Sequence, residues 1–213
     1  MNESNLNENQ TPEEKTRMKN NELNAEKFYN DFKESMQEGF QYNGVSYIEL
    51  YKGDTKRFTQ FINGKIIADI IRNNNIDVSF EYFRVDVTGW EQRKPETEKE
   101  AEDVCMNPHL WDLKIAVEHE NNQADWNDEI IKLVHINCPL RVVIGYNDSD
   151  NRETDITKLG FAAICIKKTK AFSSFDGELL VILGNCKGKY KKFDYRGYLF
   201  NRSTNSFKKI EKS

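Results

Sequence analysis

The sequence predicts an α/β domain in which a central mixed β-sheet is flanked by helices. A strand-like run, an amphipathic helix and a second strand-like run follow one another between 113 and 146, which is typical of a βαβ crossover. The runs 140–146 and 179–183 are apolar and β-branched, as expected of buried strands. Apolar residues recur at helical spacing over 22–38 and 55–72, which predicts two helices to cover the sheet.

Composition favours one folded domain with a disordered arm. The chain has 213 residues and is 31% charged, but its 12% aromatic content argues against disorder throughout. Residues 1–20 contain no aromatic side chain and are predicted to form the arm, so the domain spans 21–213 and ends in a basic segment. Because there is no apolar secretory core and no run long enough to span a bilayer, we expect a cytoplasmic protein without a membrane partner.

The other elements follow from periodicity and turn signals. Further strands are expected at 42–51, 77–88 and 113–120, further helices at 126–136 and 155–170, and one or two outer strands within 188–207. The charge-dense stretch 91–106 leaves two interpretations open, a surface helix from Glu96 onward or a flap.

The strand predicted at 113–120 carries charge on one face. Side chains alternate along a strand, so Lys114, Ala116, Glu118 and Glu120 share the face opposite Leu113, Ile115 and Val117. Two carboxylates and a lysine on a strand suited to a core are costly unless their charge is compensated, and a divalent cation is the natural partner. Asp86, near the end of the strand predicted at 77–88, supplies a third acid.

At these residues the chain resembles the PD-(D/E)XK nuclease superfamily, over about 79–146. The family pattern is an acid at a strand end, then an acid, one intervening residue and a lysine on the next strand, then a helix. Asp86, Glu118 and His119 fit this pattern, but Glu120 stands at the lysine position and no proline precedes Asp86. The resemblance implies a restriction-endonuclease-like core and a metal-dependent endonuclease that hydrolyses DNA phosphodiester bonds, with Mg²⁺ or Mn²⁺ on Asp86, Glu118 and Glu120.

The resemblance also requires a catalytic lysine, for which the sequence offers Lys132 on the following helix and Lys114 on the strand. We favour Lys132, because Lys114 lies six residues from Glu120, about 20 Å along an extended strand. The competing interpretation of Lys132 is a helix-surface ion pair with Glu129. His119 points to the apolar face of its strand and is interpreted as a core or capping residue, and Glu26 is a further candidate acid by resemblance.

The C-terminal segment from 186 onward holds nine basic residues against two acidic ones, interleaved with aromatic side chains. This composition suits a surface that contacts phosphates and stacks on bases, although alternating strands with a solvated lysine face would also produce it. The candidate nucleic-acid contacts are Lys187, Lys189, Lys191, Lys192 and Arg196. DNA is the expected partner, and a homodimer is left open.

Two other functions compete with the nuclease. A catalytically inactive nuclease-fold protein that binds nucleic acid or a protein is favoured by Glu120 and by the net charge of −4. An unrelated α/β metal-dependent hydrolase would act on small phosphate esters. The four cysteines lack paired spacing and are expected to be reduced and buried, and a zinc site from Cys105 and His109 is a weaker alternative.

Overall fold

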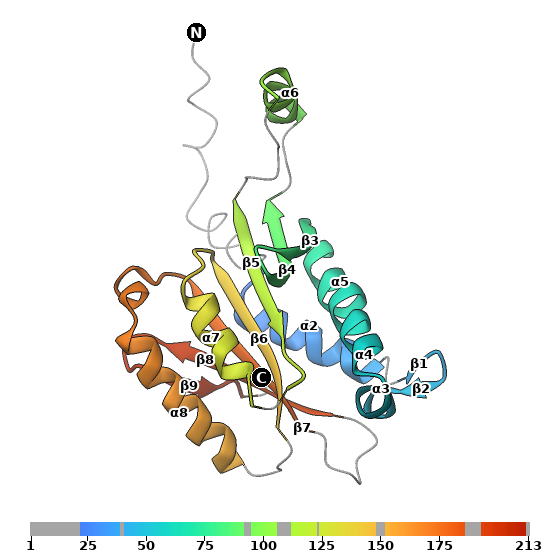
Figure 1. Ribbon diagram of the computed structural model, residues 1–213, viewed down its shortest axis with the longest axis vertical. Coiled ribbons are helices and arrows are strands. Elements are labelled where there is room, and N and C mark those ends of the chain that lie inside the picture. The colour runs from blue at the N-terminus through green and yellow to red at the C-terminus, as the bar shows by residue number, and fades with distance from the viewer. Residues whose placement is uncertain are drawn as a thin grey trace.

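The computed structural model describes residues 22–38, 41–91, 95–105, 112–122, 124–147, 152–185 and 193–211. Within these ranges seven strands form one mixed sheet, and helices lie on both of its faces (Figure 1). This arrangement confirms the predicted α/β class and mixed sheet. The predicted arm 1–20 lies outside the described residues. No helix of the described chain is long and apolar enough to cross a bilayer.

The strands of the sheet are adjacent in sequence order. They are β3 (Ile76–Tyr82), β4 (Val85–Glu91), β5 (Leu113–His119), β6 (Leu140–Asn147), β7 (Glu178–Asn185), β8 (Asp194–Asn201) and β9 (Ser206–Lys209). Strands β5, β6 and β7 pair in parallel and every other neighbouring pair is antiparallel. Helix α7 (Trp126–Val134) joins β5 to β6, so the predicted βαβ crossover is confirmed.

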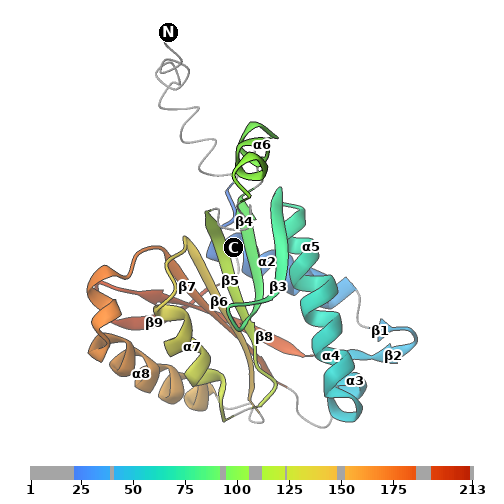
Figure 2. The same cartoon turned by 45° about the horizontal axis from the view of Figure 1, so that its top comes forward.

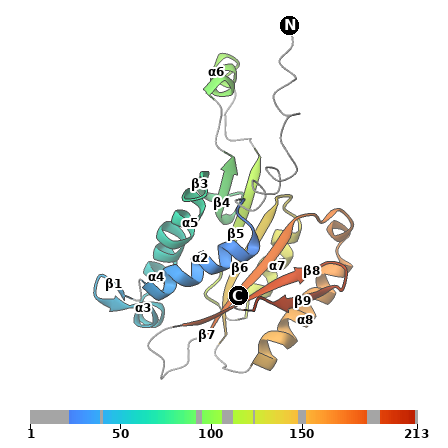
Figure 3. The same cartoon turned by 180° about the vertical axis from the view of Figure 1, so that it is seen from behind.

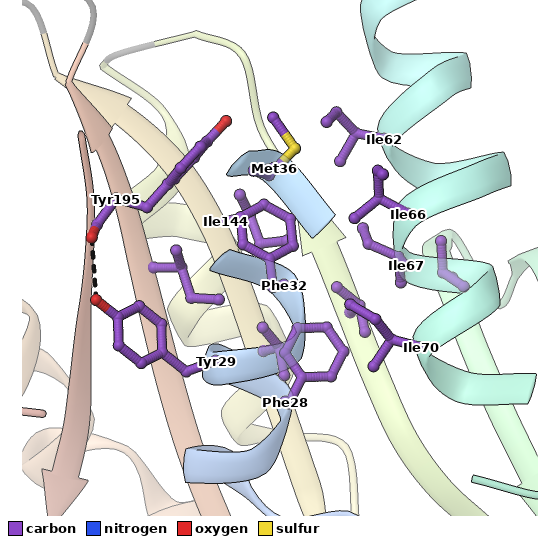
Figure 4. Packing of buried hydrophobic residues seen from close by; sticks show 14 of the residues in the cluster. Phe28, Tyr29, Phe32, Met36, Ile62, Ile66, Ile67, Ile70, Ile144 and Tyr195 are labelled. Carbon is purple, nitrogen blue, oxygen red and sulfur yellow. Dashed lines mark hydrogen bonds between the residues drawn. The ribbon is translucent and has the colours of Figure 1, made fainter. Parts of the chain in front are cut away.

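One face of the sheet is covered by α2 (Ala25–Glu38) and by a helix built of α4 (Thr55–Phe61), the π-helical segment η1 (Ile62–Ile67) and α5 (Ala68–Arg72). Figure 3 shows α2 crossing this face. Its aromatic residues Phe28 and Phe32 pack with isoleucines of the neighbouring helix (Figure 4). The hydroxyl of Tyr29 donates a hydrogen bond of 3.0 Å to the carbonyl of Tyr195, which ties α2 to β8.

The opposite face is covered by α7 and by α8 (Arg152–Lys168), followed by the short helix η2 (Lys170–Ser174). Trp126, Ile130 and Leu133 of α7 are fully buried against this face. Gly145 of β6 lies under Trp126, where a Cβ atom would meet the indole Cγ at 2.7 Å. Helix α7 therefore lies very close to the centre of the sheet.

Two strand predictions are wrong. The stretch predicted as one strand at 42–51 is a hairpin of β1 (Gln41–Tyr42) and β2 (Val45–Ser46), followed by α3 (Tyr47–Gly53). Ser46 starts α3 with a capping box to Glu49, a signal that ends the strand. The stretch predicted as one strand at 77–88 is the β3–β4 hairpin, which reverses at Phe83 and Arg84.

The remaining predictions were closer. The helices α2 and α4–α5, the buried strands β6 and β7, and two outer strands are all present, although β9 extends two residues past the predicted end at 207. Part of 91–106 forms α6 (Pro95–Asp103), which is the surface-helix interpretation of that stretch (Figure 1). Cys138 is a buried free thiol as expected, but Cys105 is exposed because it follows α6, away from the sheet. His109, its proposed zinc partner, lies outside the described residues.

Candidate active site

The antiparallel pairing of β4 with β5 brings Asp86 beside Glu118. Val87 pairs with Val117 in this ladder. Because the strands are antiparallel, the residue before Val87 lies opposite the residue after Val117, so Asp86 faces Glu118. The Cβ atoms of directly opposed residues are about 4.5–5.5 Å apart. The side chain of Asp86 also binds β5 directly, because its Oδ2 accepts a hydrogen bond of 2.9 Å from the backbone N–H of His119. Two acids 32 positions apart in the sequence thus meet at one end of the sheet.

Helix α7 places a lysine on this pair. The Nζ atom of Lys132 lies 2.6 Å from Oε1 of Glu118, although off the direction of a regular hydrogen bond. It also donates to Oε2 of Glu129, one turn earlier on α7, at 2.9 Å. Lys132 therefore joins a strand carboxylate to a helix carboxylate, and the structure combines the ion pair expected on the helix surface with the contact to Glu118.

Burial sets the protonation of the two strand acids. Glu118 is 2% exposed, and burial raises its pKa from 4.5 to about 8 against the opposing effect of Lys132, with the charge of Asp86 raising it further. The pKa of Asp86 is also raised by burial, while the His119 backbone hydrogen bond lowers it. The negative charge of Glu129 raises the pKa of both groups further. Among these side chains, one ammonium group faces three carboxyl groups.

Glu81, which the sequence pattern did not indicate as a site residue, belongs to this electrostatic environment. It occupies the hairpin position opposite Asp86, between the pairs Phe80–Val87 and Tyr82–Val85. Its charge raises the pKa of Asp86. A continuous strand through 77–88 would have put Glu81 and Asp86 on opposite faces, so only recognition of the hairpin could have brought them together.

The structure does not place Glu120 with the other two acids. It follows the last residue of β5, and its Oε1 accepts a 2.6 Å hydrogen bond from the backbone N–H of Asn122. This local turn directs the carboxylate toward the loop after β5. Lys114 is likewise remote, because it pairs with Glu91 at the start of β5, with 3.1 Å between Nζ and Oε2. Glu26 is exposed in the first turn of α2, which covers the other face of the sheet.

His119 fixes the end of β5. Its side chain is 4% exposed, with Nδ1 3.0 Å from Oδ1 of Asn63 and Nε2 2.9 Å from the hydroxyl of Tyr146. An amide oxygen only accepts, so Nδ1 carries the proton and Nε2 accepts from the tyrosine. Burial lowers the pKa of His119 to about 3, so the ring is neutral. His119 is the core residue that the sequence predicted, and its backbone N–H holds the carboxylate of Asp86.

A divalent cation fits the Asp86–Glu118 pair, since Mg²⁺ binds proteins through one or two carboxylates and fills its other positions with water and phosphate oxygens. Burial and the neighbouring acids raise the pKa of both groups, so a cation bound here would replace the proton on Glu118 and compensate the charge of the ionised pair. Within the described part of the chain, no three His, Cys, Asp or Glu side chains are grouped closely enough to hold a metal by themselves. The predicted three-acid set of Asp86, Glu118 and Glu120 is thus reduced to two acids.

The predicted nucleic-acid contacts fall into two groups. Lys187, Lys189, Lys191 and Lys192 lie outside the described residues. Arg196 is 4% exposed, and its Nε donates to Oδ2 of the fully buried Asp155 at 2.7 Å. The hydroxyl of Tyr198 donates to the same oxygen. Arg196 therefore does not face solvent. Its side chain lies on the face of β8 that α8 covers, and its guanidinium forms a buried ion pair with Asp155 of α8.

No family model, curated protein or solved structure matches this chain. The functional argument therefore depends on the geometry of Asp86, Glu118 and Lys132.

Proposed function

We propose that the chain is a metal-dependent endonuclease of restriction-endonuclease-like fold, which hydrolyses DNA phosphodiester bonds. The order of elements supports the fold: a helix, three antiparallel strands β3–β4–β5, a crossover helix and a parallel strand β6. The PD-(D/E)XK pattern needs one acid at a strand end and another on the next strand. Asp86 lies on β4 and Glu118 on β5.

The observation that carries the proposal is the contact of Lys132 with Glu118, beside Asp86. Phosphodiester hydrolysis needs carboxylates to hold a divalent cation and a positive group to stabilise the charge that develops on the phosphate. The strand supplies the carboxylates, and the helix after it supplies the ammonium that Glu120 cannot provide.

Each residue has a defined role in this proposal. Asp86 and Glu118 would hold Mg²⁺ or Mn²⁺, which when bound neutralises phosphate charge and lowers the pKa of water. Lys132 would release Glu118 and donate a hydrogen bond to a phosphate oxygen, while Glu129 keeps its ammonium on the site. His119 would act as a positioning residue, since its three hydrogen bonds hold the end of β5.

The second candidate is an inactive protein of the same fold that binds nucleic acid or a protein partner. It is favoured by Glu120 at the family's lysine position and by the two ion pairs that already engage Lys132. In such a protein the Glu118–Lys132 pair would be purely structural.

Incubation of supercoiled plasmid with purified protein and Mg²⁺ separates the two candidates. We expect nicking by the wild-type chain, and a rate about 100-fold or more lower for Asp86→Asn and Glu118→Gln. Asp69→Asn is the matched control, since Asp69 of α5 forms an ion pair with Lys65 on the helix that covers the other face of the sheet. Equal cutting by Asp86→Asn would refute the assignment, and no cutting by any variant would favour the binding protein. One site cuts one strand, so linear product would indicate a homodimer.

A further inference from the structure

The tip of the β3–β4 hairpin has an unusual backbone. Tyr82 pairs with Val85, so the chain reverses over only two residues, Phe83 and Arg84. Their φ angles are +52° and +62°, and Glu81 just before them has φ +52°. Two-residue hairpin turns with positive φ at both positions favour Asn and Gly, and a bulky residue in this region is strained. Phe83 and Arg84 therefore occupy turn positions at which Asn and Gly would be less strained.

The side chains at this tip are also exposed. Phe83 is 78% exposed and Phe80 is 45% exposed, and Arg84 faces solvent as well. The ring of Tyr82 contacts Phe83 edge to face, with 4.5 Å between centroids, and contacts Trp90 in the same way at 5.0 Å. Phe83 therefore has an aromatic neighbour on the hairpin while most of its side chain remains open to solvent.

The tip lies beside the candidate active site. Asp86 follows Arg84 by two residues and Phe83 by three, about 7 and 10 Å along a strand. Val85, next to the tip, is buried in the cluster under α7 and α8. In Figures 1 and 2 the turn between β3 and β4 lies on the side of the sheet that carries α7. The tip and Lys132 therefore lie on the same side of Asp86.

We infer that the hairpin tip contacts DNA next to the cleaved bond, with Phe83 stacked on a base and Arg84 on a phosphate; this rests on the proposed function. Base pairs follow one another every 3.4 Å, so the tip reaches about two to three steps from the phosphate at Asp86. Apolar wedges that enter base steps commonly work beside arginines in this way. The strain fits a residue retained for contact, since backbone outliers cluster at functional sites.

The test measures binding in Ca²⁺ of a fluorescein-labelled duplex of mixed sequence, with every variant in an Asp86→Asn background to prevent cleavage. Phe83→Ala should weaken binding about 5- to 150-fold, the range of one lost stacking contact. Arg84→Ala should weaken binding and reduce the salt dependence by about one counterion. Phe161→Ala is the matched control, because Phe161 is 63% exposed on α8, and it should bind as the parent does.

Two further readouts distinguish contact from a structural role. The fluorescence of Phe83→Trp should be quenched when DNA is added, and that of Phe161→Trp should not. The double substitution Phe83→Asn with Arg84→Gly introduces a favoured turn sequence, so it should raise the melting temperature. It should still weaken DNA binding, because both contacting side chains are removed. If Phe83 and Arg84 only stabilised the hairpin, the double variant would have a lower melting temperature together with its weaker DNA binding.

The outcomes separate this inference from the nuclease proposal. If the wild-type chain cuts DNA but Phe83→Ala binds as Phe161→Ala does, the tip inference is wrong and the nuclease proposal stands. If the chain never cuts but binding depends on Phe83, the tip inference stands alone. If no variant binds the duplex, the tip inference is overturned.

Discussion

Replacement of Glu118 by Gln should change how stability depends on pH, in a direction that the burial of the site determines. The fold holds a proton on Glu118 up to about pH 8, whereas the unfolded chain releases it near 4.5. Its stabilising effect is therefore complete below pH 4.5 and is lost as the pH rises toward 8. His119 acts in the opposite direction, because its pKa is lowered from 6.5 to about 3, so its stabilising effect is lost as the pH falls through that range.

The two groups give separate pH windows. One mismatched proton changes the free energy of unfolding by about 1.4 kcal/mol per pH unit. Between pH 4.5 and 6.5 the two effects cancel in the wild-type chain. Between 6.5 and 8 only Glu118 contributes, and stability should fall by about 2 kcal/mol. In Glu118→Gln stability should instead rise up to pH 6.5 and then stay level; the raised pKa of Asp86 acts against this rise in both proteins.

Urea unfolding in EDTA, followed by circular dichroism at half-unit steps from pH 5 to 8, measures these slopes. Asp69→Asn should follow the wild-type curve, since Asp69 is only half-buried and lies on α5, on the other face of the sheet from α7. The reasoning is refuted if Glu118→Gln loses as much stability between pH 6.5 and 8 as the wild-type chain does, because the proton released there would then belong to another group.

Three further predictions follow from single contacts. Lys132→Met should lower the nicking rate about 100- to 1,000-fold while the melting temperature at pH 6 stays close to wild type, because neutral Glu118 needs no cation there; nicking assays and thermal melts measure both. Asp155→Asn should lower the free energy of unfolding by about 3–5 kcal/mol in urea, since it leaves Arg196 buried without its partner. Gly145→Ala should cost about 1–3 kcal/mol in the same assay, because the new Cβ overlaps the indole of the fully buried Trp126.

The elements that the sequence predicted well are those whose burial shows in their composition. β6 and β7 are runs of apolar, β-branched residues buried on both faces, and a short amphipathic helix between β5 and β6 requires a parallel crossover. Lys132 was favoured over Lys114 by spacing alone, and the structure pairs Lys132 with Glu118 and Lys114 with Glu91.

The errors came from features that no local pattern records. The turn at Phe83 and Arg84 contains neither Gly nor Asn, so it carries no hairpin signal, and the loss of that hairpin hid Glu81 from the site. The basic character of Arg196 suggested a surface contact, but its partner Asp155 lies 41 positions away on α8. Glu120 satisfied the spacing of the family pattern, yet the turn that follows β5 directs its carboxylate to Asn122.

Anomalous diffraction from crystals soaked in Mn²⁺ tests most directly whether two strand acids form a cation site. We expect one peak about 2.2 Å from carboxylate oxygens of both Asp86 and Glu118, with Lys132 moved off Glu118, and no peak at this place in Glu118→Gln crystals. Crystals in which manganese binds elsewhere, while Lys132 remains on Glu118, would contradict the proposal that this end of the sheet is a nuclease centre.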